Sequence, residues 1–153
     1  MSEATPQYGA PNPAFGRTVE ERILGMPAAG FFGCRFGAVE PGFAEIVQPY
    51  REELSHREGF FQGGVIGAPA DFAAGASAGS LLPPGWENAT ADYTVKIVAP
   101  GVGEELVARG RVVKPGRTLT VVSVEVHAAG AGRETLLAPA LVTFRNLPPS
   151  IIR

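Results

Sequence analysis

EGFFQGGVIGAPADFAAGASAGSLLPPGWE, residues 58–87, decides the fold, because it is the most apolar stretch of the chain and holds one charge, Asp71, between its two end glutamates. Its many glycines and alanines predict a helix enclosed by a sheet, since each glycine would weaken an exposed helix by up to about 1 kcal/mol. A lone buried carboxylate is costly unless its pKa rises or it finds a partner. Asp71 therefore reaches solvent, is paired, or has a function that needs this position.

Composition limits the kind of protein. The 153 residues suit one domain, and 45% hydrophobic with 18% charged residues is typical of a globular chain. A net charge of −2 gives no reason to expect nucleic acid or an anionic membrane as a partner. Residues 1–16 are predicted to be a disordered leader without signal-peptide features, and residues 17–153 a single domain. The protein is expected to be cytoplasmic.

Before the apolar stretch, the pattern predicts one helix and two strands. The helix is expected over Thr18–Met26, with Thr18 as its N-cap and Pro27 ending it. Apolar and polar residues alternate from Phe32 to Val39, which predicts a strand. A type II turn at Glu40-Pro41-Gly42 then leads to a second strand at about 43–50.

After the stretch, the sequence predicts a meander of four strands at about 89–98, 105–114, 118–127 and 134–145. Short connections between them indicate antiparallel hairpins, one closed by a type II turn at 114–117. Strict alternation in the first of these strands puts Thr90 on the polar face, opposite Tyr93. A sheet wrapped around one central helix is the hotdog architecture, an α+β fold.

The pattern H-x-x-G-F-F-Q-G-G-V-I-G-A-P-A-D-F-A-A-G, with the hairpin G-E-E-L-V-A-R-G-R-V-V-K-P-G-R-T-L-T-V, resembles the hotdog-fold acyl-CoA thioesterases (the hydroxybenzoyl-CoA thioesterase superfamily). Within them it is most similar to the phenylacetic-acid-degradation type. The resemblance covers roughly Gly42 to Phe144. It implies a homodimer, alone or as a dimer of dimers, that hydrolyses an acyl-CoA.

The resemblance also implies roles for two residues. Asp71 falls where the family keeps its general base or nucleophile, and Gly63 where a backbone N–H polarises the thioester carbonyl. Free N–H groups at a helix start suit a developing oxyanion. Asp71 follows Gly63 by two helical turns, about 12 Å, so the resemblance implies that each site pairs Gly63 with the other subunit's carboxylate.

Other candidates depart from the family pattern or extend it. His56 stands where relatives use Asn or Gln on the carbonyl, Gln62 replaces a His, and Pro69 predicts a late start or a bend in the helix. The expected substrate contacts are Gln62, Gly64, Phe61, Phe72 and Thr90, whose hydroxyl aligns with one that positions water in some relatives. Arg109, Arg111, Lys114 and Arg117 are candidates for the phosphates of coenzyme A, or form a solvated edge hairpin.

Several alternatives stay open. Asp71 could be a structural carboxylate, and the fold could serve as a non-catalytic acyl-CoA-binding module or, less well supported, a hydratase. Gly75-Ala-Ser77-Ala-Gly79 matches the G-x-S-x-G elbow of α/β-hydrolases, but it lacks the preceding strand that an elbow needs. No metal is implied, because His56 and Asp71 lie far apart in sequence and no cluster of metal ligands surrounds them. No cofactor is implied either, because coenzyme A enters as part of the substrate.

Overall fold

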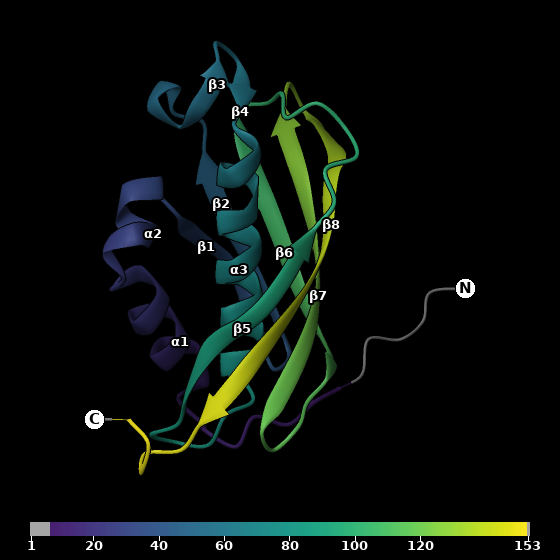
Figure 1. The fold of residues 1–153 in the computed structure, drawn as a ribbon. Helices are drawn as coiled ribbons and strands as arrows, with labels where there is room; N and C mark the ends of the chain where they lie inside the picture. Colours follow the sequence, from purple (N-terminus) through teal and green to yellow (C-terminus); the bar gives the residue numbers. More distant parts are fainter. Residues whose placement is uncertain (1–6, 153) are drawn as a thin grey trace.

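The computed structural model describes residues 7–152, and in it one antiparallel sheet curls around the long helix α3 (Figure 1). The hotdog architecture and its α+β class are confirmed. The elements in chain order are α1 (Phe15–Leu24), α2 (Pro27–Phe32), β1 (Arg35–Glu40), β2 (Phe43–Pro49), η1 (Glu52–Leu54), β3 (Ser55–Arg57), β4 (Phe60–Phe61), α3 (Gly63–Gly79), β5 (Glu87–Val95), β6 (Glu105–Lys114), β7 (Leu119–Gly130) and β8 (Arg133–Leu147).

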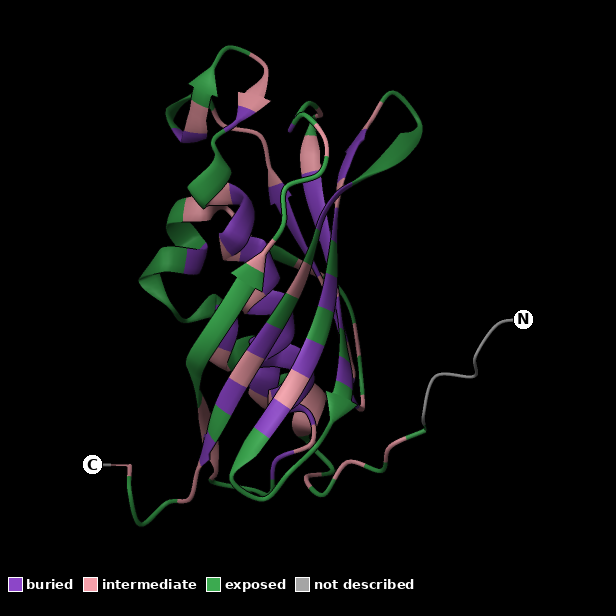
Figure 2. Cartoon of the chain, turned by 45° about the vertical axis from the view of Figure 1, so that its right-hand side comes forward, coloured by how far each residue is buried: buried purple, intermediate pink, exposed green. Residues whose placement is uncertain are grey.

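Helix α3 is the centre of the core. Almost every residue from Ile66 to Ala78 is buried (Figure 2), and the helix contacts six strands of the large sheet, β1, β2 and β5 to β8, as well as α1. A glycine of the facing strand makes this close approach possible: a Cβ on Gly110 of β6 would lie 2.8 Å from the Ala73 carbonyl oxygen of α3, so the strand and the helix pack backbone to backbone there. Pro69 lies inside α3, and the helix nevertheless begins at Gly63, so the predicted late start is wrong.

The sheet order is β1-β2-β6-β7-β8-β5, which corrects the predicted meander. Strand β5 does not pair with β6, the next strand in sequence. It pairs with β8, and β6 pairs with β2 instead. Residues 96–104 therefore cross from one edge of the sheet to its middle, and β5 is left as an edge strand that is exposed over most of its length.

The region before β1 differs most from the sequence expectation. Helix α1 begins at Phe15 with Ala14 as its N-cap, so Thr18 lies within it and is no cap. Pro27 does not end that helix but opens α2, where proline at the first position is well tolerated. The predicted strand from Phe32 starts only at Arg35, because α2 ends at a left-handed Gly33.

One predicted turn is confirmed and the other is wrong. Gly42 has φ of 79°, as the third position of a type II turn requires, and Glu40 pairs directly with Phe43. The second turn, predicted at 114–117, is not of type II, because the φ angle of Gly116 is not positive. Strands β6 and β7 are instead joined by the loop 115–118, and their pairing has a bulge between Val112 and Lys114.

Of the leader predicted for residues 1–16, residues 1–6 lie outside the described part of the chain. Residues 7–14 precede α1, and the Tyr8 hydroxyl donates a 3.4 Å hydrogen bond to the Val112 carbonyl. Tyr8 also packs against the core. Among the described helices, none is both long and apolar enough to cross a membrane.

Candidate active site

Strand β5 runs along one face of α3, and the contacts between them form a ladder from Gly75 back to Gly63. Asn88 donates a 3.0 Å hydrogen bond to the Gly75 carbonyl, and Thr90 Oγ1 donates one of 2.9 Å to Asp71 Oδ1. Further along, Tyr93 lies against Gly67 and Ile97 lies against Gly63. These helix positions are four residues apart and so share one face. Asp71 therefore lies in the middle of the face of α3 that carries Gly63, Gly67 and Gly75, and β5 with the segment after it covers this face closely.

A bulge in β5 sets which side chains face Asp71. Thr90 pairs with Phe144 and Tyr93 pairs with Val142, with a register shift between Thr90 and Asp92. Phe144 and Val142 both point into the core, and residues directly opposite each other on paired strands point to the same face. Thr90 and Tyr93 therefore both face α3, and the predicted placement of Thr90 on the opposite face is wrong.

The carboxylate of Asp71 is half-buried and has one hydrogen-bond donor. Burial raises its pKa above the ordinary value for an aspartate, because an ionised carboxylate loses hydration there, and the bond from Thr90 partly lowers it again. In the ionised group, the Thr90 hydroxyl replaces part of the hydration that burial removes. A desolvated carboxylate of this kind is a stronger base than one in water.

At the start of α3, one backbone N–H has no hydrogen-bond acceptor among residues 7–152. Gln62 is the N-cap, and its Oε1 accepts from the N–H groups of Gly64 at 2.7 Å and Val65 at 3.2 Å. The N–H of Gly63 has no partner among residues 7–152. Gln62 thus holds Gly64 as part of the cap, and the donor that the sequence predicted, Gly63, is the free one.

That donor opens onto a cleft of about 570 Å³ between the β3–β4 hairpin and the segment after β5. Three other predicted residues, His56, Phe61 and Gln62, line it together with Gly63. His56 is exposed, with its ring 5.5 Å from that of Phe60, and Phe61 is buried against Tyr50. Asp71 and Thr90 are not part of the cleft lining. The structure therefore brings the site residues together in two groups along one helix.

Arg57 is a cleft residue that the sequence reasoning missed. Its guanidinium lies 4.1 Å from the centre of the Phe60 ring, at the rim of the cleft. Only its place in the charged run REELSHRE could have pointed to it, and that run gives no reason to prefer one charge over another. Phe72, by contrast, is buried in the core, 6.3 Å from Phe32 of α2, and does not line the cleft.

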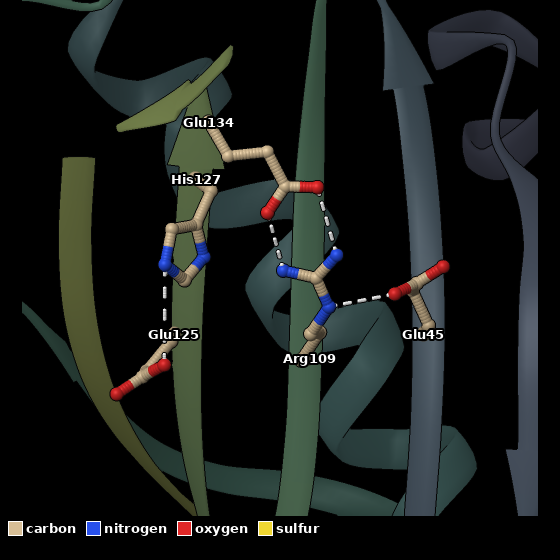
Figure 3. Close-up of polar contacts among 5 residues, drawn as sticks. All are labelled: Glu45, Arg109, Glu125, His127 and Glu134. Atoms are coloured by element: carbon tan, nitrogen blue, oxygen red, sulfur yellow. Dashed lines mark hydrogen bonds and ion pairs between the residues drawn. The ribbon is translucent and has the colours of Figure 1, made fainter. Parts of the chain in front are cut away.

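The basic residues expected to hold coenzyme A phosphates are not gathered at the cleft. Gly110 faces α3, so its neighbours Arg109 and Arg111 point to the outer face of the sheet. There Arg109 is bound by Glu45 at 2.7 Å and by both oxygens of Glu134 (Figure 3). His127 and Glu125 lie beside this cluster. Arg111 covers the Phe43 ring. Lys114 and Arg117 are exposed at the β6–β7 end.

The G-x-S-x-G match has no nucleophile. Ser77 is fully buried inside α3, and its hydroxyl donates a 2.7 Å hydrogen bond to the Ala73 carbonyl one turn earlier. An elbow serine stands exposed at a strand-to-helix turn instead. The rejection of this motif is confirmed.

The protein combines a hotdog sheet around a helix with a free N–H at the helix start and a carboxylate on the side of that helix. This combination fits the class of proteins that bind acyl thioesters, and comparisons with known proteins point to the same class. The thioesterase superfamily profile matches residues 58–134. A thioesterase family protein from Silicibacter pomeroyi is 30% identical with a TM-score of 0.85, covering 88% of this chain and 98% of that one. The chain belongs to the thioesterase superfamily.

Two further proteins are less similar to this chain. The PaaI protein of the E. coli phenylacetic acid degradation operon shares the fold at 17% identity, with a TM-score of 0.77 over 87% of this chain and 93% of that one. A protein of Saccharolobus solfataricus named as an esterase is 28% identical over 91 residues, 60% of this chain. The chain spans 64% of that relative's length.

Proposed function

We propose that this protein hydrolyses an acyl-CoA thioester to a free acid and coenzyme A. The observation that carries the proposal is the lone carboxylate of Asp71, half-buried on α3, held by Thr90 and desolvated enough to raise its pKa. Asp71 has a hydroxyl as its hydrogen-bond partner, so its basicity is kept rather than neutralised.

In this mechanism the thioester carbonyl accepts a hydrogen bond from the Gly63 N–H, at the positive end of the α3 dipole. Asp71 takes a proton from water as the water attacks the carbonyl carbon, or it attacks that carbon itself and forms a mixed anhydride that a water molecule then hydrolyses to the free acid. The tetrahedral intermediate then expels the thiolate of coenzyme A. His56, on the cleft wall, is a second donor for the developing oxyanion.

Because the cleft at Gly63 lacks Asp71, the proposal includes a homodimer in which the carboxylate at each cleft comes from the partner subunit. The exposed edge strand β5, which contains Thr90 and runs into the segment that holds Ile97, is the element that a second copy would extend. The phenylacetic-acid type and an aromatic or medium-length acyl group are part of the same proposal. Of the predicted phosphate ligands, Lys114 and Arg117 stay candidates, and Arg57 at the cleft rim joins them.

The test is release of free thiol from phenylacetyl-, hydroxybenzoyl-, hexanoyl- and palmitoyl-CoA by the wild type and by Asp71→Asn. We expect the substitution to lower kcat by about a hundredfold or more, on the scale of losing a general base. Thiol release that does not depend on Asp71 would contradict the site. Binding of coenzyme A, seen as a raised melting temperature, without any thiol release would favour the non-catalytic binding module.

A further inference from the structure

The C-terminal end of α3 borders a second pocket, which the proposed reaction does not use. It holds about 360 Å³ between the loop 80–86 that follows α3 and the loop 115–118 between β6 and β7, and we call it the α3-end pocket. It shares no lining residue with the cleft at Gly63. Ala78 follows Gly63 by 15 residues, so the two lie about 22 Å apart along the helix. The β3–β4 hairpin of the cleft is at the top of Figure 1, and the β6–β7 loop of the pocket is at the bottom.

The walls of the α3-end pocket are mainly apolar and are held in place before any ligand binds. The apolar side chains come mostly from Leu81, Leu82, Pro83, Trp86 and Pro115. Arg22 of α1 donates a 3.1 Å hydrogen bond to the Trp86 carbonyl, and Asn146 of β8 donates one of 2.7 Å to the Gly116 carbonyl. Both loops are therefore tied to the rest of the fold, so little conformational entropy is lost when a ligand enters.

The polar groups that stay free around this pocket are hydrogen-bond donors. Arg117 is exposed at its rim, is the one charged residue of its described lining, and forms no ion pair with residues 7–152. The indole N–H of Trp86 likewise has no acceptor in that part of the chain. The Ala78 carbonyl, near the end of α3, already accepts from the Leu81 N–H. Free donors and a positive charge, beside an acceptor that is occupied, favour an anion over a cation.

We propose that the α3-end pocket binds a small monocarboxylic acid with an apolar body, with the body against Trp86 and Leu82 and the carboxylate on Arg117. Covering the apolar walls supplies hydrophobic free energy, and the guanidinium offers a carboxylate two parallel N–H donors. Arg117 is also a candidate for the phosphates of coenzyme A. The acid fits this pocket better, because its described lining offers no second cation to a doubly charged phosphate. Binding of the acid does not require thiol release, so the proposal is tested separately from the proposed function.

The experiment uses Trp86 as the reporter, because it is the only tryptophan of the chain and lies in the pocket wall. The full chain is titrated with octanoate and with phenylacetate, and both tryptophan fluorescence and calorimetric heat are followed. We expect a dissociation constant below about 1 mM for at least one acid. Octanamide and phenylacetamide keep the body without the charge, and acetate keeps the charge without the body. Each of these should bind at least about tenfold more weakly.

Arg117→Gln removes the cation at an exposed position and should weaken acid binding by about tenfold. Arg145→Gln removes another exposed cation, next to the pocket residue Asn146 but outside the lining, and as the matched control should leave binding unchanged.

The proposal is overturned if neither acid gives a signal, if the amides bind as tightly as the acids, or if Arg117→Gln binds them like the wild type. Heat without any change in fluorescence would place the acid outside this pocket and overturn it as well. A fluorescence change caused by coenzyme A and not by the acids would assign Arg117 to a phosphate instead.

Discussion

At the scale of single residues, the hydrogen bond between Thr90 and Asp71 makes a prediction about pH. The base form of Asp71 is the deprotonated one, so activity is lost as the pH falls through its pKa in the folded protein. Burial raises this pKa and the Thr90 bond lowers it. Thr90→Val removes the lowering contribution only, so we expect the acid limb of the kcat/KM profile to move to higher pH.

The measurement is the pH–rate profile of Thr90→Val beside that of the wild type, with Thr94→Val as the matched control. Thr94 lies on the same strand but pairs with Leu141, on the face away from α3, and its substitution should leave the acid limb in place. An acid limb that stays fixed or moves to lower pH in Thr90→Val would show that the limb does not report Asp71.

The sequence was enough to single out Asp71 and Gly63 but not the partner of Asp71. A lone charge in an apolar helix and a glycine at a helix start are visible in the letters alone. The Thr90 contact depends on the bulge between Thr90 and Asp92, which reverses the facing of every residue before it. A period-two pattern contains no signal for one extra residue, so Thr90 was assigned to the wrong face.

At the scale of elements, the cap of α3 makes a second prediction. Gln62 satisfies two of the first N–H groups of the helix through one side-chain oxygen. Gln62→Ala should lower the free energy of unfolding by about 1 kcal/mol, the usual effect of losing an N-cap. Gln62→Asn, which offers the same amide oxygen on a shorter stem, should lose less.

Urea unfolding of the three proteins at one pH measures the difference. The cap contributes nothing if Gln62→Ala unfolds at the same urea concentration as the wild type with an unchanged slope. The outcome also bears on the site, because the cap keeps the N–H groups of Gly64 and Val65 occupied and Gly63 as the free donor.

An element can be predicted from the sequence when its own residues determine it, and not when contacts with distant parts of the chain do. Helix α3 is predictable because its 17 residues, Asp71 apart, are small or apolar, and such a stretch is helical only when enclosed. The six-residue α2 is not predictable in this way, because PAAGFF runs directly into an alternating stretch. No residue beside Gly33 signals that the helix ends there in a left-handed conformation. The position of β5 beside β8 is not predictable in the same way, because the pairing is set by the crossover at residues 96–104, whose sequence resembles that of any loop.

At the scale of the whole molecule, the free edge of β5 makes the last prediction. Lys96 and Val98 donate their N–H groups to Pro139 and Leu137 of β8. By the alternation of an antiparallel ladder, the N–H groups of Tyr93 and Val95 point the other way, away from β8. A second copy of the chain that extends the sheet would bond to these groups, and proline at position 95 would remove one of them while leaving the bonds to β8 intact.

We therefore expect the wild type to have at least twice the 16.0 kDa mass of one chain in light scattering, and Val95→Pro to shift toward the single-chain mass. Thiol release should fall with the loss of the dimer, because the cleft at Gly63 contains no carboxylate from its own chain. Val95→Ala, which shortens the same side chain but keeps the N–H, is the control and should remain a dimer. A wild type that is monomeric and fully active would show instead that Asp71 acts on a thioester bound by its own subunit.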